Sequence, residues 1–312
     1  MLSLHGYVDL PPPEDDGTRE FDHGDVHRDT GRVFVAHTAA NTVEMVDGAK
    51  GEHLMTLPGC PEGSGVLCAQ DEGIVLAAAR GAGKILVIEA RSGRSLGEIT
   101  VGPRPNGLAW DTVHKRLLVA DVQENQARLF TPLDSSGDVS QLPAQVKSLP
   151  GRPRWCVYDR ARSRFLVNIR EPACVAIFQA ETGEMLAPWP VSAAGPHGLD
   201  LDVEGSRAFV ACDAGVVVAL DLDDGRELGH TPIAGAPDAI WYNARSGRLN
   251  VAIEDPGVVD VINTHTMTLE EEIATERGAH TTAFDLDRQR LYVFLPTSCR
   301  VAVYDERAAS AP

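Results

Sequence analysis

Short apolar segments alternate with polar turns along the whole length of the chain. Runs rich in Val, Ile, Leu and Phe are separated by turn signals such as Asp-Gly, Ser-Gly and Thr-Gly. Short β-branched and aromatic runs bounded by such turn residues are typical of β-strands. Apolar residues with a 3.6-residue period do not recur over any useful length, which excludes a helical solenoid. The pattern therefore predicts an all-β protein.

One apolar segment recurs seven times with little variation. Most copies open with Arg, continue with apolar residues and end in Ala or Asn. The seven copies span residues 32–36, 74–77, 116–120, 164–168, 207–211, 248–252 and 290–294. Their spacing averages about 43 residues, within the ~40–50 residues of a four-stranded propeller blade. Seven copies also lie within the usual range of ~4–8 blades.

We therefore predict a single seven-bladed β-propeller domain over residues 1–312, built from four-stranded antiparallel blades. The predicted blades start near residues 22, 63, 106, 154, 197, 238 and 280. The last repeat ends at Asp305 and lacks a fourth strand, whereas residues 2–10 precede the first repeat and have the pattern of a strand. An N-terminal strand that completes the last blade would close the ring and remove an open sheet edge.

Three segments carry a resemblance to a known family. The residues from Val33 to Val43, continuing to Asp47, are similar to the YVTN-type propeller repeat, and Gly195–Leu199 and Gly102–Leu108 resemble its junction between blades. The resemblance covers nearly the whole chain and implies a lactonase-like seven-bladed propeller. The wider group includes lactonases, streptogramin-type lyases, secreted surface proteins and copper enzymes, so the resemblance implies a fold and leaves the activity open.

The net charge and the cysteines limit which binding partners and which cellular compartment we expect for the protein. The formal net charge is −17, and such a surface repels nucleic acid and anionic membranes, so we expect neither as a partner. None of the six cysteines forms a C-x-x-C pair, and the N-terminus has no basic segment followed by a long apolar one. We expect a reduced, cytoplasmic protein. The sequence leaves the oligomeric state open.

The start of each blade supplies the candidate functional residues. In a propeller the first strand of a blade lines the central channel, so the residues at its start gather around one axis. Alignment of the repeats places at this position Asp22, Gly63, Asn106, Arg154, His197, Asp238 and His280. The immediate neighbours add His23, Glu62 and Trp155. Three of the ten histidines thus fall at or beside one ring of seven residues.

The residue types in this ring favour metal-assisted chemistry. Imidazole and carboxylate groups are ligands that first-row divalent cations prefer, so we predict a divalent metal at His23, His197 and His280. Such a metal polarises a carbonyl or activates water. We predict that Asp238 or Glu62 serves as a further ligand or as general base.

The remaining candidate residues are predicted to bind the substrate. Arg154 is suited to hold a carboxylate through paired hydrogen bonds and is counted both among the catalytic and among the substrate-binding residues. Asn106 and Trp155 are the other substrate-binding candidates. The alternative interpretation is a polar, water-filled hub whose histidines only satisfy backbone groups.

Two functions remain open from the sequence. The ring favours a metal-assisted hydrolase or lyase that acts on a small ester, lactone or related carbonyl compound. No G-x-S-x-G elbow, P-loop or H-E-x-x-H motif occurs. The alternative is a non-catalytic propeller scaffold that presents its rim to a protein partner or ligand, because propellers serve both purposes.

Overall fold

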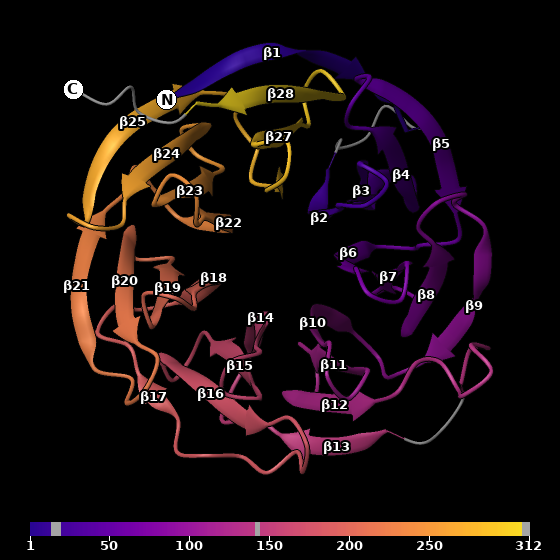
Figure 1. The fold of residues 1–312 in the computed structure, drawn as a ribbon, viewed down its shortest axis with the longest axis horizontal. Helices are drawn as coiled ribbons and strands as arrows, with labels where there is room; N and C mark the ends of the chain where they lie inside the picture. Colours follow the sequence, from indigo (N-terminus) through magenta and orange to yellow (C-terminus); the bar gives the residue numbers. More distant parts are fainter. Residues whose placement is uncertain (14–19, 141–143, 308–312) are drawn as a thin grey trace.

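The chain forms a ring of seven blades around a central channel (Figure 1). The computed structural model describes residues 1–13, 20–140 and 144–307; residues 14–19, 141–143 and 308–312 of the predicted domain lie outside this part. Each blade is a four-stranded antiparallel sheet, which confirms the predicted fold. No helix of the described residues is long and apolar enough to cross a membrane.

Most of the buried strand residues belong to the two inner strands of each blade. The innermost strands, which line the channel, are β2 (Asp22–His27), β6 (Gly63–Ala69), β10 (Pro105–Asp111), β14 (Pro153–Asp159), β18 (Pro196–Asp202), β22 (Pro237–Asn243) and β26 (Thr282–Asp285). The second strands are β3 (Arg32–His37), β7 (Ile74–Ala79), β11 (Arg116–Asp121), β15 (Arg164–Ile169), β19 (Arg207–Cys212), β23 (Arg248–Ile253) and β27 (Arg290–Leu295). The second strands coincide with the seven repeated segments of the sequence.

The outer half of each blade is more exposed. The third strands are β4 (Thr42–Asp47), β8 (Lys84–Glu89), β12 (Gln126–Phe130), β16 (Cys174–Gln179), β20 (Val216–Asp221), β24 (Val258–Asn263) and β28 (Arg300–Glu306). The outermost strands are β5 (Glu52–Pro58), β9 (Ser95–Thr100), β13 (Gln145–Ser148), β17 (Trp189–Pro190), β21 (Glu227–Pro232), β25 (Thr268–Ala274) and β1 (Leu2–Asp9). A single 3₁₀ turn, Thr38–Ala40, follows β3 within the described chain.

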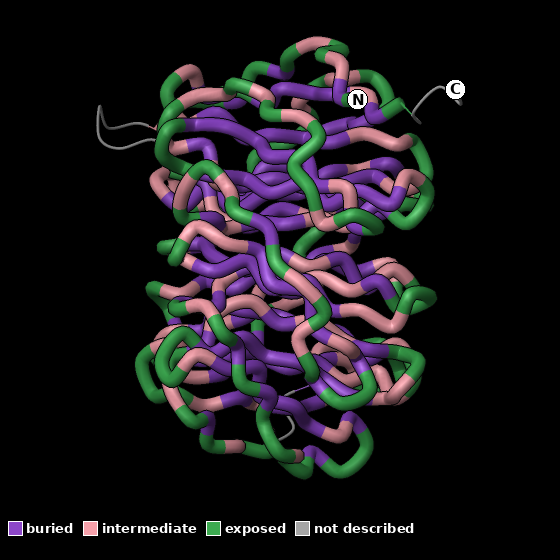
Figure 2. Tube along the Cα trace, turned by 90° about the vertical axis from the view of Figure 1, so that its left-hand side faces the viewer, coloured by how far each residue is buried: buried purple, intermediate pink, exposed green. Residues whose placement is uncertain are grey.

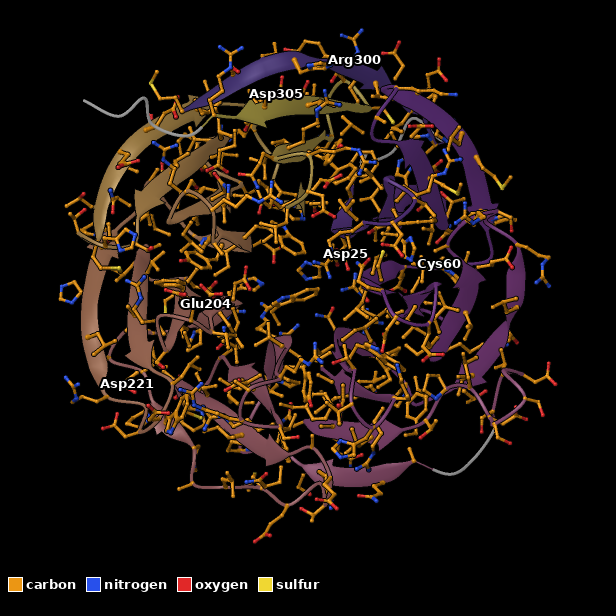
Figure 3. The ribbon with its side chains drawn as sticks, in the orientation of Figure 1. Asp25, Cys60, Glu204, Asp221, Arg300 and Asp305 are labelled. Carbon is orange, nitrogen blue, oxygen red and sulfur yellow. The ribbon has the colours of Figure 1, made fainter. Side chains whose placement is uncertain are left out.

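The N-terminal strand closes the ring. Strand β1 pairs antiparallel with β28, with Leu2 opposite Glu306 and Asp9 opposite Arg300. Figure 3 shows Arg300 and Asp305 along this outer pair of strands. The predicted completion of the last blade by the N-terminal strand is therefore confirmed, and the sheet edge that β28 would expose is covered.

The core consists of one hydrophobic cluster at each junction between neighbouring blades. At the first junction, for example, Phe34 and Ala36 of blade 1 lie with Val66 and Val75 of blade 2. Because successive side chains of a strand point to opposite faces, each inner sheet is buried against both of its neighbours. Figure 2 shows the result: buried stretches lie inside, and exposed ones gather at the turns and outer strands.

The innermost strands begin with an irregularity that shapes the mouth of the channel. In blades 3 to 6 the strand starts at Pro, and its pairing with the second strand shifts between this Pro and the third residue after it. In blade 5 the shift lies between Pro196 and Leu199. Bulges of this kind redirect side chains. Antiparallel pairing also brings the end of each second strand to the same mouth, as Pro196 lies opposite Cys212.

Candidate active site at the mouth of the central channel

The starts of the innermost strands enclose a cavity of about 530 Å³, called the polar cavity below. It is lined mainly by charged and polar residues: Glu20, Asp22, His23, Arg80, Asn106, Arg154, Arg170, His197, Asp213, Ala236, Pro237, Asp238, Glu254 and His280. The structure thus brings together all three predicted histidines with Asp238, Asn106 and Arg154.

The Asp238 carboxylate lies at the centre of this cavity, where three imidazoles converge. The Nε2 atom of His197 is 3.2 Å from Asp238 Oδ1, and that of His23 is 4.0 Å from the same oxygen. On the other side, His280 Nε2 is 3.7 Å from Asp238 Oδ2. Burial alone would raise the pKa of Asp238, but the three imidazoles, His197 foremost, hold it well below its usual range. Asp238 is therefore a buried carboxylate that stays charged.

His197 is held between two carboxylates. Its Nδ1 atom is 2.9 Å from Asp213 Oδ1, while its Nε2 atom faces Asp238. Burial alone would lower the pKa of His197, but the charge of Asp238 and the hydrogen bond with Asp213 raise it to about 9. Asp213 is in turn 2.9 Å from Arg170 Nε. His197 consequently carries a proton on both ring nitrogens at neutral pH.

The other two imidazoles are oriented from the cavity wall. His280 donates its Nδ1 proton to the Gly278 carbonyl oxygen at 2.9 Å, which turns Nε2 towards Asp238. Burial opposes protonation of His280, but the charge of Asp238, followed by more distant carboxylates, raises its pKa. His23 is buried, and its ring packs at a tilt of 41° against Trp155 with centroids 3.9 Å apart.

Two arginines differ in how they are held. Arg80 Nη1 donates to Asn106 Oδ1 at 3.0 Å and lies 3.4 Å from Asp22 Oδ2, so its charge is matched within the cavity wall. The Nε atoms of both arginines are buried without a hydrogen-bond partner among the described residues, but Arg154, unlike Arg80, also forms no ion pair there. Burial lowers the pKa of Arg154, because the charged guanidinium is less well solvated in the cavity wall than in water. Arg154 is the cation of this cavity that is best placed to take an anionic ligand.

Two predicted site residues lie apart from the polar cavity. Glu62 is half-exposed and pairs with Arg104, with 2.6 Å between Oε2 and Nη2. Its left-handed backbone (φ 47°) immediately precedes β6, at the edge of the inner ring. Trp155 contacts the polar cavity only through His23 and lines a second cavity described below. The catalytic assignment of Glu62 and the substrate-binding assignment of Trp155 stay predictions.

The sequence alignment missed a second set of lining residues. Four second strands, β7, β15, β19 and β23, end at residues 79, 169, 212 and 253. The residue directly after each of these ends lines the polar cavity: Arg80, Arg170, Asp213 and Glu254. Because the second strand runs antiparallel to the first, its end reaches the same mouth. The sequence carries a signal for them, because in four blades a charged residue directly follows the apolar run of the second strand.

The imidazoles match the donor type of a divalent metal site, and two have the partners that metal-binding histidines usually have. Asp213 holds His197 Nδ1, and the Gly278 carbonyl holds His280 Nδ1, which leaves both Nε2 atoms for the centre of the cavity. The Asp238 carboxylate lies at that centre. No group of three or more His, Cys, Asp or Glu side chains in the described part of the chain is arranged to hold a metal ion. The divalent ion stays a prediction of the sequence, and the chemistry below rests on the side chains themselves.

Comparison with known proteins adds no assignment. No family model matches the chain, and no curated protein matches it. The resemblance to the YVTN-type repeat therefore remains an interpretation of the sequence, whereas the seven-bladed architecture stands on the strand pairing described above.

Proposed function

We propose that the polar cavity is the active site of a hydrolase or lyase that acts on a small carbonyl compound, an ester or lactone carrying an anionic group. One observation carries the proposal: three imidazoles surround one carboxylate beside the guanidinium of Arg154, which forms no ion pair among the described residues. Clustered titratable groups with perturbed pKa values in a cavity are typical of catalytic sites. The volume of about 530 Å³ is that of a small-molecule site.

His197 is the proton donor in this proposal. In ester hydrolysis water adds to the carbonyl carbon and loses a proton to Asp238, and in elimination Asp238 takes the proton from the carbon next to the carbonyl. In both reactions the C–O bond breaks, and the oxygen that leaves with the bonding electrons needs a proton. His197 supplies it from Nε2, while Asp213 fixes the ring through Nδ1 and stabilises the imidazolium. The charge of Asp238 raises the pKa of His197 and His280, and its carboxylate faces the Nε2 atoms of both rings.

Arg154 binds the anionic end of the substrate. Its guanidinium lines the polar cavity and forms no ion pair among the described residues, so it can offer charge-assisted hydrogen bonds to a carboxylate or to the oxyanion that develops on the carbonyl. Asn106 and Arg80 form the opposite wall as a pair and limit the orientation of the substrate. The proposal thus assigns proton transfer and anion binding to different blades.

The test is turnover of a panel of small esters, lactones and β-substituted carboxylates by purified protein. We expect His197→Gln to lower kcat by about 100-fold or more, the usual contribution of a general acid. We expect Arg154→Met to raise KM for anionic compounds more than it lowers kcat, because it removes binding. His230→Gln is the matched control, since this exposed histidine pairs only with Glu227 on the outer strand β21.

The outcomes separate the two functions left open by the sequence. Each variant must show the wild-type unfolding midpoint before its kinetics are interpreted. Unchanged turnover in both cavity variants would contradict the assignment of the site. Lack of turnover of every compound by wild type, together with stoichiometric capture of a partner that survives His197→Gln, would favour the non-catalytic scaffold.

A further inference from the structure

A second cavity, called the apolar cavity below, lies further along the same innermost strands. Its volume is about 230 Å³. It begins at Asp25 on β2, three residues beyond Asp22, a distance of about 10 Å along a strand. Its walls include the indoles of Trp110, Trp155 and Trp241 with aliphatic side chains such as Leu67, Leu108 and Ile240. The contacting rings of His23 and Trp155 lie between the two cavities, because His23 lines the polar one and Trp155 the apolar one.

Two carboxyl groups line this cavity, whose walls are otherwise mainly apolar and also include Gln70, Thr112 and Tyr158. Asp25 accepts backbone N–H groups from Val26 and Cys68, both at 2.7 Å. Asp200 accepts them from Leu201 at 2.8 Å and from Tyr242 at 2.6 Å. Each carboxyl therefore joins its own innermost strand to that of the next blade. Figure 3 shows Asp25 on the inner side of the ring.

The charge of these carboxyls has no counterion among the residues that line the apolar cavity. No Lys, Arg or His is among the residues that line the apolar cavity, and neither Asp25 nor Asp200 forms an ion pair within the described residues. Burial raises the pKa of Asp200 to about 7 in spite of the two backbone hydrogen bonds, and the neighbouring charge of Asp25 adds to this rise. A bound cation would remove the unfavourable interaction between the two carboxyls.

The aromatic walls favour the same class of ligand. Trp110 donates its indole N–H to Asp71 at 2.8 Å, and Trp241 donates to the Thr282 carbonyl at 3.0 Å. Since these donors are occupied, the two indoles offer the cavity carbon surface rather than hydrogen bonds. Such surface binds flat apolar groups, and the faces of indole rings attract cations.

We propose that the apolar cavity is a binding site for a small organic cation, an ammonium group on an aromatic or aliphatic body. The ammonium lies at Asp25 and Asp200, and the body lies against the tryptophans. The cavity of about 230 Å³ exceeds the ~150 Å³ that accepts benzene, so it holds one ring with a short chain. This site is separate from the polar cavity, and the inference does not depend on the function proposed there.

The first test varies the charge of the ligand and leaves the protein unchanged. The probes are 2-phenylethylammonium, the neutral 2-phenylethanol and the anionic 3-phenylpropionate, measured by calorimetry and by intrinsic fluorescence. Three of the four tryptophans line the cavity, so occupancy changes the emission. We expect the ammonium to bind at least about tenfold more tightly than the alcohol, and the carboxylate to bind most weakly. Equal affinity for all three, or no binding of the ammonium at millimolar concentration, would overturn the proposal.

The second test determines whether the ammonium binds in the apolar cavity. Asp200→Asn and Asp25→Asn each keep the shape of the side chain and remove one charge, so each should weaken the ammonium at least about tenfold and leave the alcohol unaffected. The matched control is Asp260→Asn, because Asp260 is a buried carboxyl that accepts one backbone N–H, from Ala234 at 2.8 Å, outside the cavity. Wild-type ammonium affinity in both cavity variants would contradict the site. If one variant does not fold, the other variant and the ligand series still decide.

Discussion

At the scale of single residues, the molecule places its ionisable groups in two contrasting surroundings. Asp238 and His197 lie beside groups of opposite charge, and the pKa of His197 rises to about 9. No Lys, Arg or His is among the residues that line the apolar cavity with Asp200, and burial raises the pKa of this carboxyl to about 7. The same channel thus favours the protonated form of His197 at one end and raises the pKa of a carboxyl further along.

The raised pKa of Asp200 predicts a particular dependence of stability on pH. An acid whose pKa is higher in the folded state contributes stability that is complete below its unfolded pKa of about 4 and is lost as pH rises through about 7. We expect the difference in free energy of unfolding between wild type and Asp200→Asn to fall by at most about 4 kcal/mol between pH 4 and 8. Urea unfolding at several pH values measures it. A difference independent of pH would show that Asp200 titrates in its usual range.

The metal site predicted from the sequence can also be tested at the level of single residues. We expect about one equivalent of a first-row divalent metal per chain if His23, His197 and His280 are ligands, and its loss in His197→Ala/His280→Ala. Elemental analysis of gently purified, tag-free protein measures it. Because metal binding must displace the imidazole protons, occupancy should rise with pH. Protein without metal before and after incubation with Zn²⁺, Mn²⁺ or Fe²⁺ would contradict the metal prediction.

The sequence predicts where the innermost strands start, because each strand ends at a recognisable turn. Counting back a fixed number of residues from that turn reaches the residue at the mouth of the channel. His197, His280 and Asp238 line the polar cavity for this reason. The orientation of a side chain within a bulge could not be read, since a shift of one residue turns it to another face. Trp155 accordingly lies towards the apolar cavity, and Glu62 lies at the exposed rim.

At the scale of elements, close approach of neighbouring innermost strands requires glycine in the bulges. A Cβ atom on Gly198 would lie 2.4 Å from the Asp238 carbonyl oxygen, and one on Gly107 would lie 2.3 Å from that of Arg154. These glycines therefore set the spacing between the strands that carry the site residues. The apolar repeats predicted the strands themselves, because second strands are buried on both faces and stay continuously apolar.

Gly198→Ala tests this spacing. The added methyl group must push β22 away from β18, which we expect to cost about 1–3 kcal/mol of folding free energy. The displacement should also alter the contact between His197 and Asp238. Thermal unfolding measures the cost, with Gly6→Ala as control, because a Cβ on Gly6 meets no atom within 4 Å. Equal midpoints for the two variants would show that the strands move apart without cost.

At the scale of the whole molecule, stability depends on closure of the ring by β1. This strand contributes Leu2 to the cluster between blades 6 and 7, and Val8, followed by Leu10, to the cluster between blades 7 and 1. One terminal strand therefore supports both junctions of the last blade and covers the edge of β28. The strand count predicted this closure, since the last repeat is one strand short.

Removal of residues 1–10 tests the closure. Loss of three buried apolar side chains, at about 1.5–3 kcal/mol each, should lower the free energy of unfolding by at least about 4 kcal/mol. The exposed edge of β28 should also promote self-association, measured by light scattering, because an unpaired strand is a template for another chain. A synthetic peptide of residues 1–10 should restore the midpoint and the monodisperse state, whereas a peptide with Leu2, Val8 and Leu10 changed to Ser should not. A truncated chain that unfolds at the wild-type midpoint would mean that the other five junctions hold the ring without closure.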